Sequence, residues 1–307
     1  MIENIMKHAI RSLAKAVKQQ RSIRLCRRAA LTVVLSGLTN ADLLPMESNY
    51  IADRVGGRSC QLLALYLTRK IAVSEWREHF LDLFRHVIIN ADSWNNKNAF
   101  STSQFWLNKL FLTLEDYQQD IVLSGTVWLD EAYYPVINSQ IDLKEDGSKY
   151  RGLSHNQICI GAATDNKNIV CFMEGVGKTS QRRSFQTFSN HIAPYSTLIH
   201  DMETAHKKLV SVLNLKNEEY LAKDLKGLKD RDNPLEPVND LHNSLKKFPD
   251  VHSGFNRGRL QDYLNLFAFV RNPPFEPLEK LEKVVTLVFQ NPKSLHYRDQ
   301  FGLNEGF

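Results

Sequence analysis

The order in which hydrophobic patterns follow one another constrains the fold of this chain most. Residues up to about 120 show the spacing typical of helices, whereas short β-rich segments begin near Val122. The first, TVWLDEAYY at 126–134, starts with the bulky residues of a buried strand, and QICIGAATD at 157–165 and NIVCFMEGVG at 168–177 follow it. Turn residues separate the three segments, so the sequence predicts an antiparallel meander.

The segments that follow extend this pattern to a mixed α/β fold. SFQTFSNHI at 184–192 is typical of a helix, STLIHD at 196–201 of a fourth short strand, and METAHKKLVSVL at 202–213 of an amphipathic helix. The order β-β-β-α-β-α predicts a sheet with helices on its faces. The charged stretch at 216–237 has no clear period, and we expect a loop there.

The first part of the chain is predicted to be helical and basic. Two stretches show helical spacing of apolar residues: VSEWREHFLDLFRHVI at 73–88 and FSTSQFWLNKLFLTL at 100–114. The polar stretch NADSWNNKNA at 90–99 separates them and is expected to interrupt the helix. The pair is compatible with a helix-turn-helix and equally with another small helical bundle. The first 30 residues carry eight Lys or Arg against the single acid Glu3. That asymmetry fits either a solvated helix face or a helix that contacts phosphates.

Composition narrows the class of protein. The formal net charge of +5 is a mild basic excess that favours an anionic partner. The four cysteines are widely spread and form no CxxC pair, which argues against a zinc ribbon and against a disulfide framework. The N-terminal stretch lacks the apolar segment of a signal peptide, and ALTVVLSGL at 30–38 is too short to span a bilayer. We therefore expect an intracellular soluble protein.

Two acidic residues stand where predicted strands end. Asp130 follows TVWL, and Asp201 follows STLIH. Ends of adjacent strands can hold two side chains on one rim of a sheet, and two carboxylates that close stay ionised only with a cation between them. A hard divalent ion such as Mg²⁺ or Mn²⁺ is the natural occupant. Alternatively, each acid is an exposed strand end, and Asp201 caps a helix that begins at Met202.

A third set of polar residues lies in EPVNDLHNSLKK at 236–247. Pro237 suits the first turn of a helix, on which Asn239, either His242 or Asn243, and Lys246 lie along one face. An amide oxygen can join the ligands of a hard metal, and a lysine can hold a phosphate as a point charge. Two acids, an amide and a lysine together predict phosphodiester chemistry.

These residues carry a resemblance to a known family. With HSGF at 252–255 and LQDYLNLFAFVRN at 260–272, their types and order resemble the DDE-type transposases of bacterial insertion sequences. Within that family the chain most resembles the ISXO-like group, whose members often carry the residue pattern DDNK. The resemblance covers roughly residues 100 to 272. It implies an α/β fold with an RNase H-like mixed sheet flanked by helices, after a helical N-terminal region.

The resemblance also implies site residues, cofactor and partners. Asp130, Asp201 and Asn239 would be ligands of Mg²⁺ or Mn²⁺, and Lys246 would complete the catalytic set. The implied activity is phosphodiester cleavage and strand transfer at the ends of an insertion sequence. The implied partners are double-stranded DNA, as terminal repeats and as target, and further copies of the chain assembled on that DNA. No membrane is implied, and the location is cytoplasmic and nucleoid-associated.

The chain departs from the family in two respects. It has no N-terminal zinc ribbon, and Asn239 leaves the metal site one charge short, so that Glu236 or Asp240 is a conceivable substitute. An inactive or domesticated copy that binds DNA without cutting it is therefore the alternative, and a protein-interaction scaffold is a more distant one. The expected organisation is a basic helical DNA-binding region at 1–120, the catalytic domain at 121–272 and a helical tail at 273–307.

Overall fold

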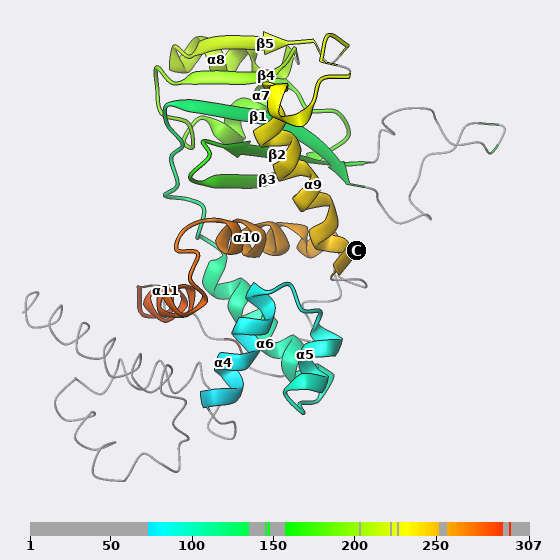
Figure 1. Ribbon diagram of the computed structural model, residues 1–307, viewed down its shortest axis with the longest axis vertical. Coiled ribbons are helices and arrows are strands. Elements are labelled where there is room, and N and C mark those ends of the chain that lie inside the picture. Colours follow the sequence, from blue (N-terminus) through cyan, green and yellow to red (C-terminus); the bar gives the residue numbers. More distant parts are fainter. Residues whose placement is uncertain are drawn as a thin grey trace, which may run out of the picture. The chain divides into compact units, whose positions relative to one another are not determined.

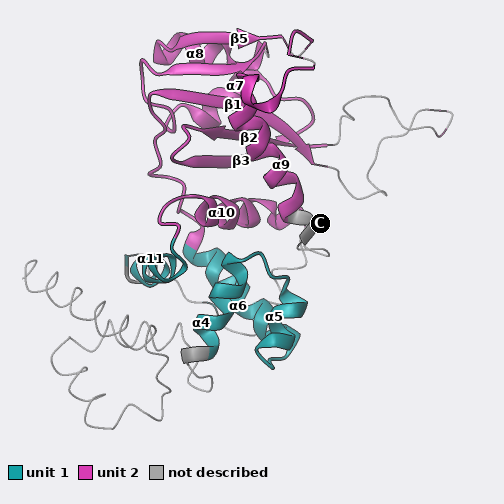
Figure 2. Cartoon of the chain, in the orientation of Figure 1, with its two compact units in different colours: residues 1–113, 276–303 teal, residues 114–275, 304–307 magenta. Residues whose placement is uncertain are grey.

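The computed structural model describes two compact units of the chain (Figure 2). One unit comprises residues 1–113 with 276–303, and the other comprises 114–275 with 304–307. The described residues are 73–134, 145, 147, 157–202, 204–221, 223–225, 227–251, 257–290 and 295. The basic N-terminal stretch, His252 and the loop cations Lys144, Lys149 and Arg151 lie outside them. The predicted limits and roles of the three regions stay a prediction.

A five-stranded mixed sheet organises the second unit (Figure 1). Its spatial order is β3-β2-β1-β4-β5, with β1–β2 and β2–β3 antiparallel and with β4 and β5 running parallel to β1. The strands are β1 (Thr126–Tyr134), β2 (Ile158–Thr164), β3 (Ile169–Val176), β4 (Thr197–Asp201) and β5 (Lys216–Tyr220). The predicted meander and the fourth strand are confirmed.

Helices cover both faces of this sheet (Figure 1). Helices α7 (Gln181–Phe188) and α8 (Lys207–Leu213) pack on one face, over a core that includes Leu129, Leu198 and Phe188. The other face carries α9 (Glu236–Val251), which contacts β1 and β2, while α10 (Leu260–Arg271) contacts β3. Short 3-10 turns lie at Thr204–His206, Asp230–Asp232 and Arg257–Arg259. This arrangement confirms the predicted RNase H-like α/β fold class.

Strand β5 was not predicted from the sequence. It lies at the edge of the sheet inside the charged stretch for which we expected a loop, so that expectation was wrong there. Its five residues, KNEEY, contain four polar side chains, and Lys216 pairs with Glu218 two residues along on the same side of the strand. Charged residues are typical of edge strands because they discourage pairing with other chains, and they hide the strand from a hydrophobic pattern.

The first unit is helical where it is described. Its helices are α4 (Val73–Phe84), α5 (Ile89–Asn95), α6 (Phe100–Leu114) and α11 (Pro277–Gln290). Trp76 of α4 stacks on Trp106 of α6 with ring centroids 4.3 Å apart. The stretch expected to break the helices holds α5 instead, because Asp92 is buried against His79 at 2.7 Å rather than exposed. None of the described helices is long and apolar enough to cross a membrane.

Candidate active site

The two predicted acids lie on neighbouring strands in matching positions. β1 and β4 run parallel, and their pairing ends with Val127 opposite Leu198 and Trp128 opposite Ile199, two residues before each acid. Asp201 ends β4 as predicted, but β1 continues to Tyr134, so the prediction that Asp130 ends a strand was wrong. Trp128 and Ile199 pack with the residues leading into α9. Because side chains alternate along a strand, Asp130 and Asp201, each two residues further on, point to the same α9 face.

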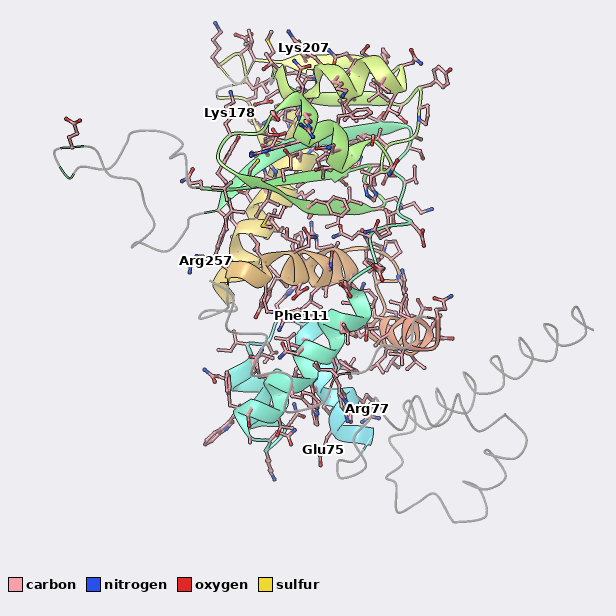
Figure 3. All side chains as sticks on the ribbon, turned by 180° about the vertical axis from the view of Figure 1, so that it is seen from behind. Glu75, Arg77, Phe111, Lys178, Lys207 and Arg257 are labelled. Atoms are coloured by element: carbon pink, nitrogen blue, oxygen red, sulfur yellow. The ribbon has the colours of Figure 1, made fainter. Side chains whose placement is uncertain are left out.

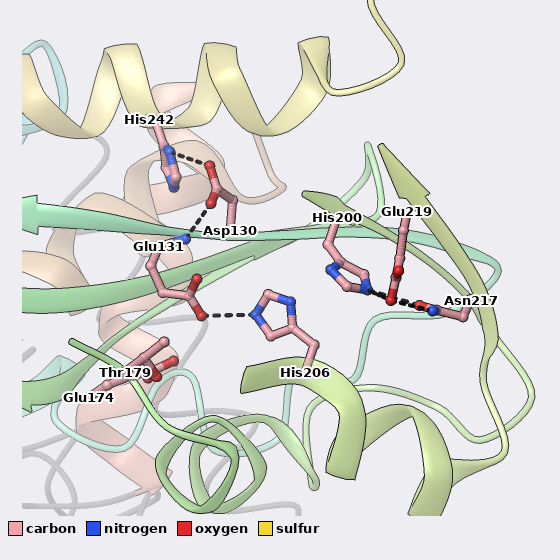
Figure 4. A network of polar contacts seen from close by, with 9 residues as sticks. All are labelled: Asp130, Glu131, Glu174, Thr179, His200, His206, Asn217, Glu219 and His242. Atoms are coloured by element: carbon pink, nitrogen blue, oxygen red, sulfur yellow. Dashed lines mark hydrogen bonds and ion pairs between the residues drawn. The ribbon is translucent and has the colours of Figure 1, made fainter. Parts of the chain in front are cut away.

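The Asp130 carboxylate has two described contacts (Figure 4). Its Oδ1 accepts a hydrogen bond from the backbone N–H of Glu131 at 2.8 Å, and its Oδ2 lies 3.3 Å from Nδ1 of His242. The Asp130 side chain is 25% exposed, whereas that of His242 is 8% exposed. His242 is therefore the residue of α9 that contacts Asp130.

The sequence of α9 explains how His242 reaches the sheet. Pro237 stands in its first turn, and Val238, Leu241 and Leu245 form the buried stripe that packs on β1 and β2. His242 borders that stripe and is itself buried. The polar side of α9 therefore starts at His242, the residue that contacts Asp130.

Asn239 and Lys246 lie on the flank of α9 that His242 occupies. A helix turns by about 100° per residue, so positions 239 and 246, seven residues apart, nearly coincide in angle, with position 242 beside them. Asn239 is half-buried and Lys246 is exposed. Among the described residues, Asp130 makes no hydrogen bond to either side chain. Their roles as ligand and catalytic lysine stay predictions.

Glu131 lies on the opposite face from Asp130 (Figure 4). Its Oε1 is 2.8 Å from Nε2 of His206, and the two side chains are only 4% and 0% exposed. Burial lowers the pKa of His206, but the hydrogen bond and the negative charge of Glu131 raise it, and the net shift is upward. Glu131 is thus in contact with His206 and is not exposed to solvent.

A second buried acid, Glu174, lies on the same face as Glu131. It is the extra residue of a bulge in β3, because Cys159 pairs with Gly175 and Ile160 with Met173. Burial raises the pKa of Glu174 from 4.5 to about 7, and its Oε2 accepts a hydrogen bond from the hydroxyl of Thr179. Sequence analysis did not single out this residue.

Gly161 makes room for Glu174. A Cβ at this position would meet Oε1 of Glu174 and the ring of Phe188, each at 2.6 Å. A glycine inside an otherwise apolar strand often marks a bulge or a close approach. That glycine was the signal in the sequence that something large packs against β2 there.

A further histidine, His200, has polar and aromatic neighbours inside the protein. Nε2 of His200 lies 2.8 Å from Oδ1 of Asn217, and its ring meets that of His206 edge-on with centroids 4.6 Å apart. Burial lowers the pKa of His200, and the neighbouring charge of His206 lowers it further.

Two alternatives raised by the sequence are answered by the structure. Asp201 does not cap a helix at Met202, because α8 begins at Lys207 after a 3-10 turn. Asp240 is exposed and its carboxylate binds Arg271 of α10 at 3.0 Å, so it is directed away from Asp130.

The donor set at this site suits a hard divalent cation in type. In the part of the chain that the structure describes, no three His, Cys, Asp or Glu side chains cluster closely enough to hold a metal. The oxygen ligands available from one sheet face are the carboxylates of Asp130 and Asp201, and the nearby amide is that of Asn239. Mg²⁺ and Mn²⁺ accept such oxygen ligands and take remaining positions from water. The metal ligands stay a prediction.

Comparisons with known proteins add little to this geometry. No protein-family model matches the chain, and neither does any curated protein. Among solved structures the chain is similar to one described as the "Crystal structure of a pre-cleavage Mos1 transpososome". The identity is 11%, and the TM-score is 0.31 over 78% of this chain and 80% of that chain. A likeness this weak transfers no residue role to the present chain.

Proposed function

We propose that this chain is a metal-dependent DNA transposase of an insertion sequence, which cleaves phosphodiester bonds and transfers strands at the ends of the element. The observation that supports the proposal is the parallel pairing of β1 with β4, in which Trp128 and Ile199 are paired and Asp130 and Asp201 each follow two residues later. Two carboxylates held close together repel unless a cation joins them, so this arrangement favours a metal site over a structural role.

Each residue of the site has a role in this proposal. Asp130, Asp201 and Asn239 supply oxygen ligands, and His242 holds the Asp130 carboxylate through its Oδ2. Lys246, two turns beyond Asn239, holds a phosphate of the DNA. Mg²⁺ or Mn²⁺ bound there supplies the Lewis acid that stabilises the charge of the attacking and leaving oxygens. No covalent enzyme intermediate is needed.

The partners follow from this chemistry. The substrate is double-stranded DNA, both as the terminal repeats of the element and as the target. Joining two ends requires two active sites, so the chain works as a homo-oligomer assembled on DNA. The net charge of +5 fits such a polyanionic partner.

The test is metal-dependent nicking of a supercoiled plasmid by the full chain. We expect Asp130→Asn and Asp201→Asn each to lower the nicking rate by at least about 100-fold, because each removes a charged ligand. Asp240→Asn is the matched control, since it removes an exposed acid of α9 that binds Arg271. Its rate should stay within about twofold of the wild type. Nicking that survives in both β-strand variants would exclude this site.

The alternative function is a copy that binds DNA without cutting it. The observation that favours it is the lack of a third described carboxylate near Asp130 and Asp201, with the amide of Asn239 in its place. Such a copy would bind DNA with a steep salt dependence and show no nicking with either Mg²⁺ or Mn²⁺.

A further inference from the structure

The helices on the face opposite α9 are basic and contain no acid. Helices α7 and α8 together hold four Lys or Arg residues and no Asp or Glu. By contrast, α9 mixes both signs of charge, as does α11. A solvated helix of ordinary composition carries both signs, so the bias on this face needs another account.

The cations of these helices lie at one rim of the sheet. β3 and β4 run parallel to β1, and α7 and α8 follow their carboxyl ends. Arg182 therefore stands near the start of α7, and Lys207 and Lys208 open α8, at the rim where β4 ends with Asp201. Asp130 lies further back, in the middle of β1. All three cations are exposed. Among the described residues, none of the three forms an ion pair.

A fourth cation, Lys178, lies in the turn that leads from β3 into α7 and is also exposed. Figure 3 shows Lys178 and Lys207 on the side of the unit that carries α7 and α8. The two helices pack against each other, and Nζ of Lys208 lies 4.6 Å from the ring centroid of Phe185 in α7. The positive charges therefore come from one continuous surface, which we call the α7/α8 surface: Lys178, Arg182, Lys207 and Lys208.

Hydrogen bonds fix the backbone under this surface. The hydroxyl of Thr179 donates to Glu174, and Nη1 of Arg183 donates to the carbonyl of Val176 at 2.9 Å, so the turn before α7 is held twice. The start of α8 is held by the contact between His206 and Glu131. A surface whose backbone is fixed in advance loses less entropy when a ligand orders its side chains.

The acids beneath the surface do not cancel its charge. Glu131 is paired with His206, and Glu174 is buried and holds its proton more strongly than an ordinary glutamate. All charged side chains on α7 and α8 themselves are cations. Such a surface suits a ligand with regularly spaced negative charges, and phosphates of duplex DNA are spaced in that way.

We propose that the α7/α8 surface binds the phosphate backbone of double-stranded DNA, so that the duplex crosses the rim at which β4 ends with Asp201 onto the face opposite α9. The identity of the polyanion as DNA rests on the proposed function. The location of the surface rests on the exposed cations, the acid-free helices and the shared rim.

The test is binding of the full chain to a fluorescent duplex of arbitrary sequence, in buffer with chelator and without divalent metal, across a salt series. We expect Arg182→Ala/Lys207→Ala to weaken binding roughly tenfold and to lower the salt slope by about 1 for each phosphate that is no longer neutralised. The charge-preserving variant Arg182→Lys/Lys207→Arg should bind within about twofold of the wild type, since binding to phosphate here needs the charge alone.

The matched control removes two cations from the opposite rim. Lys167 lies in the turn between β2 and β3, and Lys216 opens β5, and both are exposed. Lys167→Ala/Lys216→Ala should change the affinity by less than about twofold, although it alters the net charge equally. Thermal melting followed by circular dichroism checks that each variant is folded.

Two results would overturn the proposed surface: equal affinity in the test and control variants, or no wild-type affinity for the duplex. The nicking assay separates this inference from the function on which it rests. Nicking by a wild type whose Arg182→Ala/Lys207→Ala variant binds normally would keep the nuclease and exclude the surface. Weakened binding in that variant, without nicking by the wild type, would keep the surface and exclude the nuclease.

Discussion

Asp130 and Glu131 are neighbours in β1, yet they meet opposite surroundings. Asp130 faces α9, keeps a quarter of its side chain exposed and lies 3.3 Å from a histidine nitrogen. Glu131 faces α8, is 4% exposed and lies 2.8 Å from His206. The first carboxylate still has oxygen lone pairs to offer a ligand, whereas the second is already neutralised inside the protein.

Adjacent residues of one strand can therefore differ in purpose, one stabilising the fold and the other remaining available to a ligand. A buried acid with a tight partner contributes to the fold, because removing either partner leaves a charge or a polar atom without a neighbour. A partly exposed acid with a loose partner contributes little to the fold and remains available for binding. Substitution of the buried Glu131 should therefore change stability, whereas substitution of Asp130 should change activity.

The largest effect on stability is expected from Glu131→Ala. The change leaves Nε2 of His206 buried without its partner, which should lower the free energy of unfolding by about 4 kcal/mol. Urea unfolding at about pH 6, below the ordinary histidine pKa of 6.5, measures this while His206 carries its proton.

A double-mutant cycle with His206→Ala is the control for this pair. Removing both partners should cost less than the sum of the two single changes, since the second removal relieves the atom orphaned by the first. Strict additivity would show that Glu131 and His206 stabilise the fold independently, and the contrast between the two faces would fail.

The next largest effect is a dependence of stability on pH through Glu174. The pKa of this acid is 4.5 in its ordinary state and about 7 in the folded chain, because burial disfavours its charge. Below pH 4.5 both states hold the proton and the contribution to stability is complete. As the pH rises toward 7, only the unfolded state ionises, so up to about 3 kcal/mol is lost.

Glu174→Gln isolates this effect, because glutamine cannot ionise. The free energy of unfolding of the wild type minus that of the variant should fall between pH 4.5 and pH 7 and level off above. Chemical unfolding at a series of pH values gives both curves. Parallel curves would show that Glu174 ionises in the folded chain as it does in the unfolded one.

Sequence analysis identified candidate residues on the α9 face of the sheet but few of the contacts on the α7/α8 face. The strand end at Asp201 and the helix face that carries His242 could be predicted because both are local patterns of a few adjacent residues. Asp130 was expected at a strand end but lies in the middle of β1, because AYY continues the strand beyond the two acids. The pairing of Glu131 with His206 joins residues far apart in the chain, and nothing local at either position indicates it. Strand β5 escaped because its side chains are polar, and Glu174 because a bulge breaks the alternation on which strand prediction depends.

Gly161→Ala tests how tightly the α7/α8 face is packed. The added methyl group would meet Glu174 and the ring of Phe188 at 2.6 Å, so one of them must move. We expect a loss of about 2 kcal/mol in the free energy of unfolding, measured in urea. Phe188→Leu in the same chain should recover part of that loss by making space, and a failure to recover any would place the strain elsewhere.

The smallest effect on stability is expected from Asp130→Asn, in contrast to its neighbour. Asparagine keeps an oxygen that can accept from the Glu131 N–H, and the Asp130 side chain is partly exposed with a loose contact to His242 at 3.3 Å. Without metal, the free energy of unfolding should stay within about 0.5 kcal/mol of the wild type. Added Mg²⁺ or Mn²⁺ should then raise the melting temperature of the wild type but not that of the variant, since binding to the folded state alone stabilises it. A variant as unstable as Glu131→Ala would make Asp130 a structural acid and remove the difference between the two faces.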